Sequence, residues 1–169
     1  GTSARAVKIV EGGELLLGGK VSSSDHTVNE KTFEFLRGMF GGPLPRNSMS
    51  MVIADPIDGC SPLTNSEAVT DKIAIVVRGQ CMFTNKGTNV ERAGALGMVV
   101  INRDTLDITR MWAGEREMRT ITIPSVMISK ANGDILETAL NAGTVNGSLN
   151  LATGTFTGNL VPGIQHIND

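Results

Sequence analysis

Two short, continuously apolar runs near the middle of the chain place the strongest constraint on its fold. Residues 72–77 (KIAIVV) and 98–101 (MVVI) are rich in β-branched side chains, as is typical of strands that are buried on both faces. Between them, residues 85–96 place small or apolar side chains on one narrow face, which predicts a helix with Gly97 as its C-terminal cap. A strand, about 20 residues that contain a helix, and a second strand predict a right-handed βαβ unit with parallel strands.

The same alternation recurs towards the C-terminus and indicates an α/β domain. Residues 121–128 (ITIPSVMI) predict a third strand, and Pro124 would confine its first half to an edge or a bend. Ser129 is a suitable N-cap for a helix over residues 131–142. Two further runs predict strands on either side of these elements, at residues 49–54 (MSMVIA) and 145–151.

The first part of the chain is less regular. Residues 21–31 are polar and without periodicity, which predicts an exposed loop, and residues 6–10 and 15–17 predict short strands. Residues 33–45 carry three of the five phenylalanines and predict a segment that packs on the core and then turns away. We therefore divide the chain into a partly flexible N-terminal extension with the first strands, a domain core, and a C-terminal strand or tail, at residues 1–32, 33–151 and 152–169.

Charge and hydropathy exclude two classes of partner. The formal net charge is −2, with acidic and basic residues interspersed. No basic stripe is available for a phosphate backbone, so we expect no nucleic-acid partner. The longest apolar runs have about five residues, whereas a membrane helix needs about 20. We therefore expect no membrane insertion by this segment.

The sequence also lacks the usual patterns of catalytic and metal sites. His26 and His166 are the only histidines, and no H-E-x-x-H, C-x-x-C or G-x-S-x-G pattern occurs. We therefore expect no catalytic residue, no metal and no cofactor.

The cysteine content is compatible with two compartments. Cys60 and Cys81, the only two cysteines, could form a disulfide in an oxidising compartment or remain two buried thiols in a reducing one. A single N-x-[ST] sequon begins at Asn146, in a setting that is typical of a turn, and makes this residue a candidate for glycosylation.

Six sequence blocks, in a fixed order, resemble the protease-associated (PA) domain family. The block R-G-x-C-x-F follows the central apolar strand and is continued by Lys86, Asn89 and the run A-G-A. The blocks that carry the resemblance are FGGPLP at residues 40–45, ADPIDGC at 54–60, KIAIVVRGQCMF at 72–83, AGA at 93–95, IPSV at 123–126, and S-x-x-x-G-x-x-L at 129–136.

This resemblance implies a fold, a compartment and a function. The fold would be an α/β PA domain with a β-sandwich or open barrel and two or three flanking helices. A Cys60–Cys81 disulfide would place the chain in the secretory-pathway lumen or outside the cell. The sequence looks closest to the PA domains of ER degradation-enhancing alpha-mannosidases, subtilases and vacuolar sorting receptors.

The resemblance further implies a non-catalytic module that binds a protein or peptide ligand, or docks on an adjacent domain of its parent chain. Two alternatives stay open. The chain could be a stand-alone hydrolase that depends on a thiol or a metal, or a purely structural spacer.

Arg78, Gly79 and Gln80 form the predicted ligand-binding loop. In the PA domains of sorting receptors the matching arginine helps to bind the cargo peptide, and a carboxylate or a backbone carbonyl is the natural target of a guanidinium. Gly79 would allow a sharp turn at the end of a buried strand. The alternative is that Arg78 pairs with a nearby acid and only shapes the loop. Gln80 stands where many relatives carry Asp, which removes a charge from the loop.

Met111 and Trp112 form a second predicted contact. Trp112 is the only tryptophan in the chain and lies in a segment of alternating charge, residues 105–120. An aromatic anchor with a polar rim is typical of a protein interface. The alternative is that Trp112 folds back and covers the sheet.

Overall fold

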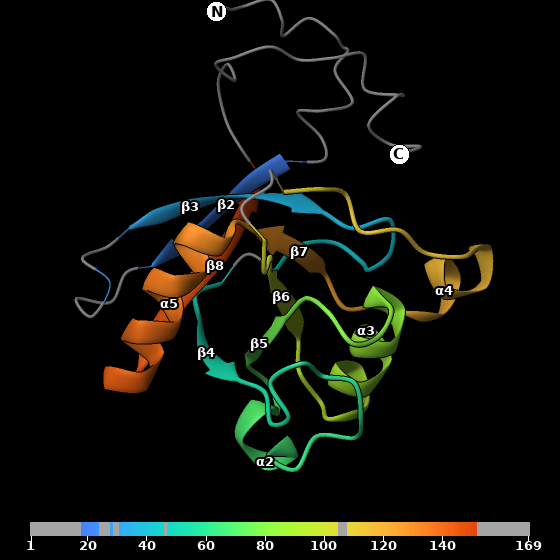
Figure 1. Cartoon of the computed structure of the whole chain (residues 1–169), viewed down its shortest axis with the longest axis horizontal. Helices are drawn as coiled ribbons and strands as arrows, with labels where there is room; N and C mark the ends of the chain where they lie inside the picture. Colours follow the sequence, from blue (N-terminus) through green and yellow to red (C-terminus); the bar gives the residue numbers. More distant parts are fainter. Residues whose placement is uncertain (1–17, 24–27, 29–30, 46, 105–107, 152–169) are drawn as a thin grey trace, which may run out of the picture.

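A ring of seven strands forms the framework of the domain (Figure 1). The computed structural model describes residues 18–23, 28, 31–45, 47–104 and 108–151. The strands are β2 (Gly18–Ser23), β3 (Thr32–Arg37), β4 (Met49–Ile53), β5 (Ile73–Val77), β6 (Gly97–Ile101), β7 (Ser125–Ile128) and β8 (Val145–Leu151). The helices in this part of the chain are α2 (Ser66–Val69), α3 (Phe83–Arg92), α4 (Glu115–Thr120) and α5 (Lys130–Ala142).

The parallel part of the ring confirms the predicted βαβ unit. β4, β5, β6 and β7 lie side by side in parallel, with Ile75 opposite Val99 and Val99 opposite Val126. Helix α3 connects β5 to β6, and these two strands are buried along their whole length. The carboxyl ends of the parallel strands therefore point the same way, which brings the loops after them together.

Antiparallel strands close the ring. β3 pairs with β7, β2 pairs with β3, and β8 pairs with both β2 and β4. The predicted α/β class is confirmed. Within the described residues, β8 joins the two edges of the sheet, so the strands form a closed barrel.

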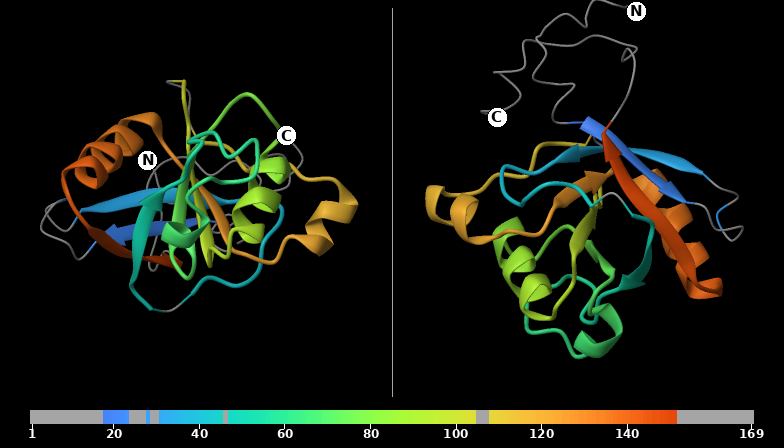
Figure 2. Two further views of the ribbon diagram at one scale, coloured as in Figure 1. Left: turned by 90° about the horizontal axis from the view of Figure 1, so that it is seen from below. Right: turned by 180° about the vertical axis from the view of Figure 1, so that it is seen from behind.

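Alternate residues of the strands point into the barrel and form one core. This inner core includes Phe35, Ile75, Val99 and Val126, and α5 adds Leu136. Gly133 allows α5 to approach the barrel closely, since a Cβ atom at this position would overlap Ile101. Figure 2 shows α5 beside the barrel, on the side opposite to α3.

The remaining side chains of β5, β6 and β7 form a second core on the outer face of the sheet. Val76, Val100 and Met127 pack there with Val90 of α3. Met111, from the segment that precedes α4, completes this outer core. The sheet is buried on both faces here, which explains why the sequences of β5 and β6 are continuously apolar.

Several predicted element boundaries are wrong. Residues 21–23 belong to β2 rather than to an exposed loop, and Val28 is buried. β2 lies within residues 1–32, the segment that we predict to hold an N-terminal extension and the first strands. Gly97 begins β6 instead of capping α3. That helix ends at Arg92, and Gly94, with a φ of 93°, makes the turn behind it.

Two further predictions need correction near the C-terminus. The third strand begins at Ser125 rather than at residue 121. The backbone N–H of Thr122 donates to Oε1 of Glu91 on α3 instead of to a neighbouring strand. Asn146 lies within β8 and not in a turn. The predicted strands at residues 6–10 and 15–17, the two histidines and the tail from residue 152 lie outside the described residues.

Candidate functional site: the disulfide-linked loops after β4 and β5

The predicted R-G-x-C loop lies at the carboxyl end of β5. Arg78 follows the last residue of that strand, and its backbone N–H donates to the carbonyl oxygen of Ile101, the last residue of β6. Asn102 and Asp104 follow β6, and the turn from Asp55 to Cys60 follows β4. Three loops thus meet at one end of the parallel strands, where α/β proteins commonly bind ligands.

Arg78 is anchored but remains accessible. Its Nη1 donates to Oδ1 of Asn102 at 3.2 Å and lies 4.0 Å from Oδ2 of Asp104. The guanidinium carbon lies 5.5 Å from the centre of the Phe83 ring, within the range of a cation–π contact. The side chain nevertheless exposes 37% of its surface. The alternative in the sequence analysis was that Arg78 pairs with a nearby acid. Asp104 is such an acid, although its distance of 4.0 Å is at the outer limit of an ion pair.

The two residues after Arg78 have left-handed backbone conformations. The φ angle is 116° at Gly79 and 71° at Gln80. Gly79 tolerates its angle because it has no Cβ atom, as the sequence predicts. Gln80 carries the same backbone geometry at a steric cost and is exposed. The loop therefore turns sharply and presents Gln80 to solvent.

A disulfide joins this loop to the turn after β4. Cys60 and Cys81 are bonded, with a separation of 21 positions in sequence and 5.8 Å between their Cα atoms. Asp58 supports the turn, since its Oδ1 accepts the backbone N–H of Cys60 at 2.9 Å. The disulfide implied by the family resemblance is confirmed, and neither sulfur is a free thiol in this state.

Lys86 of α3 contacts both loops of the candidate site, and the sequence analysis included it only as part of a motif. Its side chain is fully buried, and Nζ donates to the carbonyl oxygens of Asp58 at 2.8 Å and of Gly79 at 2.7 Å. Sγ of Cys60 lies 3.6 Å from the same nitrogen. Burial lowers the pKa of Lys86, and the Asp58 carboxylate opposes that shift.

Side chains of α3 thus also hold the two disulfide-linked loops by hydrogen bonds. Lys86 binds one carbonyl from each loop, and Asn89, one turn later on α3, donates to the carbonyl oxygen of Gly59 at 2.9 Å. These bonds fix the positions of the loop backbones, and they do not involve Arg78 itself. A preformed loop loses little conformational entropy when it binds a ligand.

The structure separates the two residues of the second predicted contact. Trp112 exposes 59% of its surface, as expected of an anchor, whereas Met111 is completely buried in the outer core. Met111 therefore cannot contact a ligand directly. It fixes its segment instead, and its carbonyl oxygen accepts the backbone N–H of Met39. Met118 of α4 is 40% exposed and adds apolar surface in the same segment.

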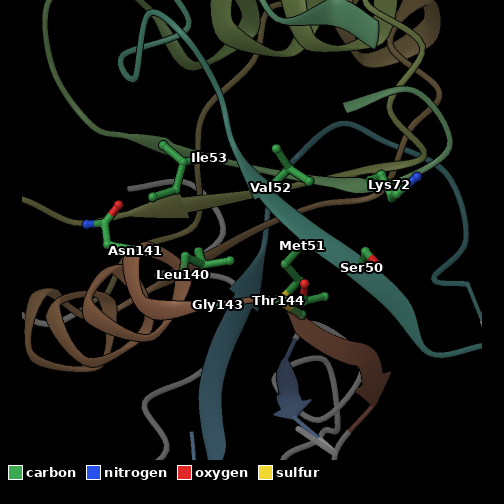
Figure 3. Close-up of a pocket in the computed structure, with 9 residues that line it drawn as sticks. All are labelled: Ser50, Met51, Val52, Ile53, Lys72, Leu140, Asn141, Gly143 and Thr144. Carbon is green, nitrogen blue, oxygen red and sulfur yellow. The ribbon is translucent and has the colours of Figure 1, made fainter. Parts of the chain in front are cut away.

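A groove that the sequence analysis did not find lies between β4 and α5 (Figure 3). It is open, has a volume of about 510 Å³, and includes Ser50, Val52, Lys72 and Leu140 in its walls. The Ser50 hydroxyl donates to Oδ1 of Asn146 at 2.9 Å, so the sequon lies beside this groove. The lining residues come from three separate segments of the chain, which is why no single sequence pattern marks the groove.

The described residues contain no group of three or more His, Cys, Asp or Glu side chains that could hold a metal ion. None of the helices within these residues is long and apolar enough to span a membrane.

The barrel, its parallel segment and its disulfide-linked loops define a small α/β domain of a kind that recurs within longer proteins. A family profile described as "PA domain" matches residues 48–136, and the chain belongs to this family.

Curated relatives share this part of the chain. Human "ER degradation-enhancing alpha-mannosidase-like protein 3" is 40% identical over 91 residues, which are 50% of this chain and 10% of that protein. "Signal peptide peptidase-like 5" of Arabidopsis thaliana is 32% identical over 127 residues, which are 72% of this chain and 23% of that protein. The match therefore spans less than a quarter of either relative.

The fold recurs in solved structures as well. The aminopeptidase from Aneurinibacillus sp. strain AM-1 superposes with a TM-score of 0.60 and 20% sequence identity, over 79% of this chain and 30% of that one. In each of these proteins the matched region is a minor part of a longer chain.

Proposed function

We propose that this PA domain is a non-catalytic module that binds a polypeptide segment through the loop of Arg78, Gly79 and Gln80. The observation that carries the proposal is the combination of anchoring and exposure at Arg78. Asn102 and the Phe83 ring hold the guanidinium in place, and the side chain is still 37% exposed. A planar guanidinium in a fixed position favours a carboxylate or a pair of carbonyl oxygens as its ligand.

The weak pair between Arg78 and Asp104 suits such an exchange of partners. Asp104 is half exposed and lies 4.0 Å from Nη1, and an exposed pair of this kind stabilises a protein by at most about 1 kcal/mol. A carboxylate of the ligand could therefore take the place of Asp104 without a large cost. Gln80, exposed on the same loop, would add neutral hydrogen-bonding groups beside it.

Selection of peptides tests this proposal. A phage-displayed library of linear peptides is panned on the oxidised chain, and the affinities of selected peptides are then measured by calorimetry. We expect Arg78→Ala to weaken binding by at least about tenfold, equivalent to about 1.4 kcal/mol. Arg103→Ala is the matched control, because Arg103 is also exposed and also paired, with Glu137 at 3.3 Å. Equal affinities for the two variants would contradict the proposal.

Trp112 supports a second function, docking on an adjacent domain of a longer chain. A tryptophan with 59% of its surface exposed, six residues before the exposed Met118 in sequence, offers an apolar anchor. As the only tryptophan, it reports its own environment. We expect its emission to shift to the blue when a neighbouring domain of the parent protein is added, and Trp112→Ala to abolish binding. An unchanged spectrum and unchanged binding would favour a structural spacer.

The hydrolase alternative has less support. Thiol catalysis requires a free cysteine, and both cysteines are in the disulfide. Stoichiometric zinc in the purified protein, or hydrolysis that survives Arg78→Ala, would restore this alternative.

We also propose that the chain works in the secretory-pathway lumen or outside the cell, with Asn146 glycosylated. The disulfide supports the compartment, as does the name of the mannosidase-like relatives. We expect mass spectrometry to show that the native protein is not alkylated before reduction. After reduction, Cys60 and Cys81 should each gain one label. Loss of a glycan mass in Asn146→Gln, with no such loss in Asn141→Gln, would establish the modification.

A further inference from the structure

Cys60 and Cys81 have different electrostatic surroundings. The buried Lys86 ammonium lies 3.6 Å from Sγ of Cys60. An ammonium has three N–H donors, and here they match three acceptors, which are this sulfur and the carbonyl oxygens of Asp58 and Gly79. Of the two cysteines, Cys60 is the one that Lys86 contacts.

We propose that Cys81 is a site of thiol–disulfide exchange, at which an external thiol forms a mixed disulfide while Cys60 leaves as a thiolate stabilised by Lys86. The thiolate of the incoming molecule attacks Sγ of Cys81, a new S–S bond forms there, and the Cys60–Cys81 bond breaks. The bonding electron pair stays on Sγ of Cys60. The rate of such a step increases as the leaving thiol becomes more acidic, so the contact with Lys86 determines which sulfur leaves.

Three features oppose this direction: the Asp58 carboxylate, the N-terminus of α3, and the carbonyl oxygens of Asp58 and Gly79, each 3.6 Å from Sγ of Cys60. Asp58 accepts the backbone N–H of Cys60, and its negative charge disfavours a thiolate there. Helix α3 begins two residues after Cys81, and its N-terminus favours a thiolate at that cysteine. However, a helix end carries about half a charge, and its effect falls off within one turn. The full charge of Lys86, in contact with Cys60 and shielded from water, is the stronger influence.

Access does not distinguish the two sulfurs, because Cys60 and Cys81 are both half-buried. Gln80 is exposed and Met82 exposes 60% of its surface, so Cys81 has an exposed neighbour on either side. Cys60 follows the buried Gly59 and precedes the exposed Ser61. The proposed direction of attack therefore depends on the contact between Lys86 and Cys60. The inference does not depend on the proposed peptide binding, because it concerns only the disulfide and Lys86.

Trapping the mixed disulfide tests the direction of attack. The oxidised native protein is treated with reduced glutathione, quenched with acid, alkylated and digested, and the modified peptides are quantified by mass spectrometry. We expect glutathione on Cys81 and the alkyl label on Cys60, with a preference of about tenfold over the reverse pattern. Glutathione mainly on Cys60, an equal distribution, or no adduct in the native protein would overturn the proposal.

A second measurement tests the role of Lys86. In Cys81→Ser, Cys60 is the only thiol, and the pH dependence of its reaction with iodoacetamide gives the apparent pKa of the Cys60–Lys86 pair. We expect the reaction to reach half its maximal rate at a pH below about 8.5, the ordinary pKa of a cysteine thiol. In unfolding concentrations of urea this pH should return towards about 8.5. Lys86→Met in the same background should slow labelling at neutral pH.

The matched control is Cys60→Ser, which leaves Cys81 without the ammonium contact. Its thiol should titrate at a higher pH than that of Cys60. If Lys86→Met does not fold, the comparison of the two cysteine variants still decides the question. A native Cys60 with an apparent pKa of 8.5 or above would overturn the proposal.

Discussion

Lys86 is a buried charged residue, and its burial makes the free energy of unfolding depend on pH in a defined direction. Burial lowers its pKa from the ordinary value of 10.5, against the opposing effect of Asp58. Between the lowered value and 10.5 the unfolded chain therefore binds more protons than the folded one, so the free energy of unfolding rises with pH in that interval. We expect the difference in free energy of unfolding between wild type and Lys86→Met to shift in favour of wild type as the pH rises.

The slope can reach at most about 1.4 kcal/mol per pH unit for one proton. Urea unfolding at several pH values between neutrality and 10.5 measures it, and the chain has no tyrosine whose ionisation would interfere. Lys130→Met is the control, because Lys130 is exposed and pairs with Asp134 on the surface of α5. If the difference in free energy of unfolding between wild type and Lys86→Met stayed constant with pH, this would contradict the direction of the pKa shift.

Gly133 provides a second test at the scale of one residue. An alanine normally favours a helix over glycine by about 1 kcal/mol, but here its Cβ atom would overlap Ile101. We expect Gly133→Ala to lower the free energy of unfolding by about 1–2 kcal/mol, because overpacking exceeds the gain in helix propensity. A double-mutant cycle with Ile101→Ala tests whether overlap with Ile101 is the cause. Gly133→Ala should lower the free energy of unfolding by less when residue 101 is already alanine. Independent, additive effects would show that the contact is not responsible.

At the scale of elements, the sequence predicted the strands and helices whose buried side chains follow a regular pattern. It did not predict the elements that lack such a pattern. β5, α3 and β6 were predictable because continuously apolar strands and a one-sided helix have clear patterns. α4 was missed, because none of its residues is buried. β2 was missed too, because its sequence GGKVSS has no apolar alternation, and its place depends on pairing with β3 and β8.

The candidate site divides in the same way. The Arg78 loop could be located from its motif, since it follows an obvious strand. The burial of Lys86 could not be anticipated, because lysine is usually exposed and its partners are backbone carbonyls of distant loops. Met111 and Trp112 are neighbours in sequence, but their opposite burial is fixed by the outer core, which assembles from several segments.

Ser129 tests whether a local sequence signal contributes to stability as predicted. Its side chain accepts the backbone N–H of Asn132 at 3.1 Å and so caps α5. We expect Ser129→Ala to lower the free energy of unfolding by about 1 kcal/mol. Ser61→Ala, in an exposed loop, should change it by less than about 0.5 kcal/mol. Thermal and urea unfolding measure both variants, and equal effects would argue against a capping role.

At the scale of the whole molecule, the disulfide and the barrel stabilise the fold by separate means. The ring is closed by the pairing of β8 with β2 and β4, whereas the disulfide joins two loops that follow the adjacent strands β4 and β5. Lys86 and Asn89 hold the same loops by hydrogen bonds. Removal of the disulfide should therefore weaken the domain without changing its topology.

The combined variant Cys60→Ser/Cys81→Ser tests this separation. A cross-link between residues 21 apart in sequence is expected to contribute about 3 kcal/mol through the entropy of the unfolded chain. We expect the urea midpoint to fall accordingly while the circular dichroism spectrum of the native state stays the same. Reductant should lower the midpoint of the wild type to a similar value and leave that of the variant unchanged. If the variant instead lost its native spectrum in the absence of urea, the disulfide would be a condition for closing the barrel, and the hydrogen bonds of Lys86 and Asn89 would be insufficient to hold the loops.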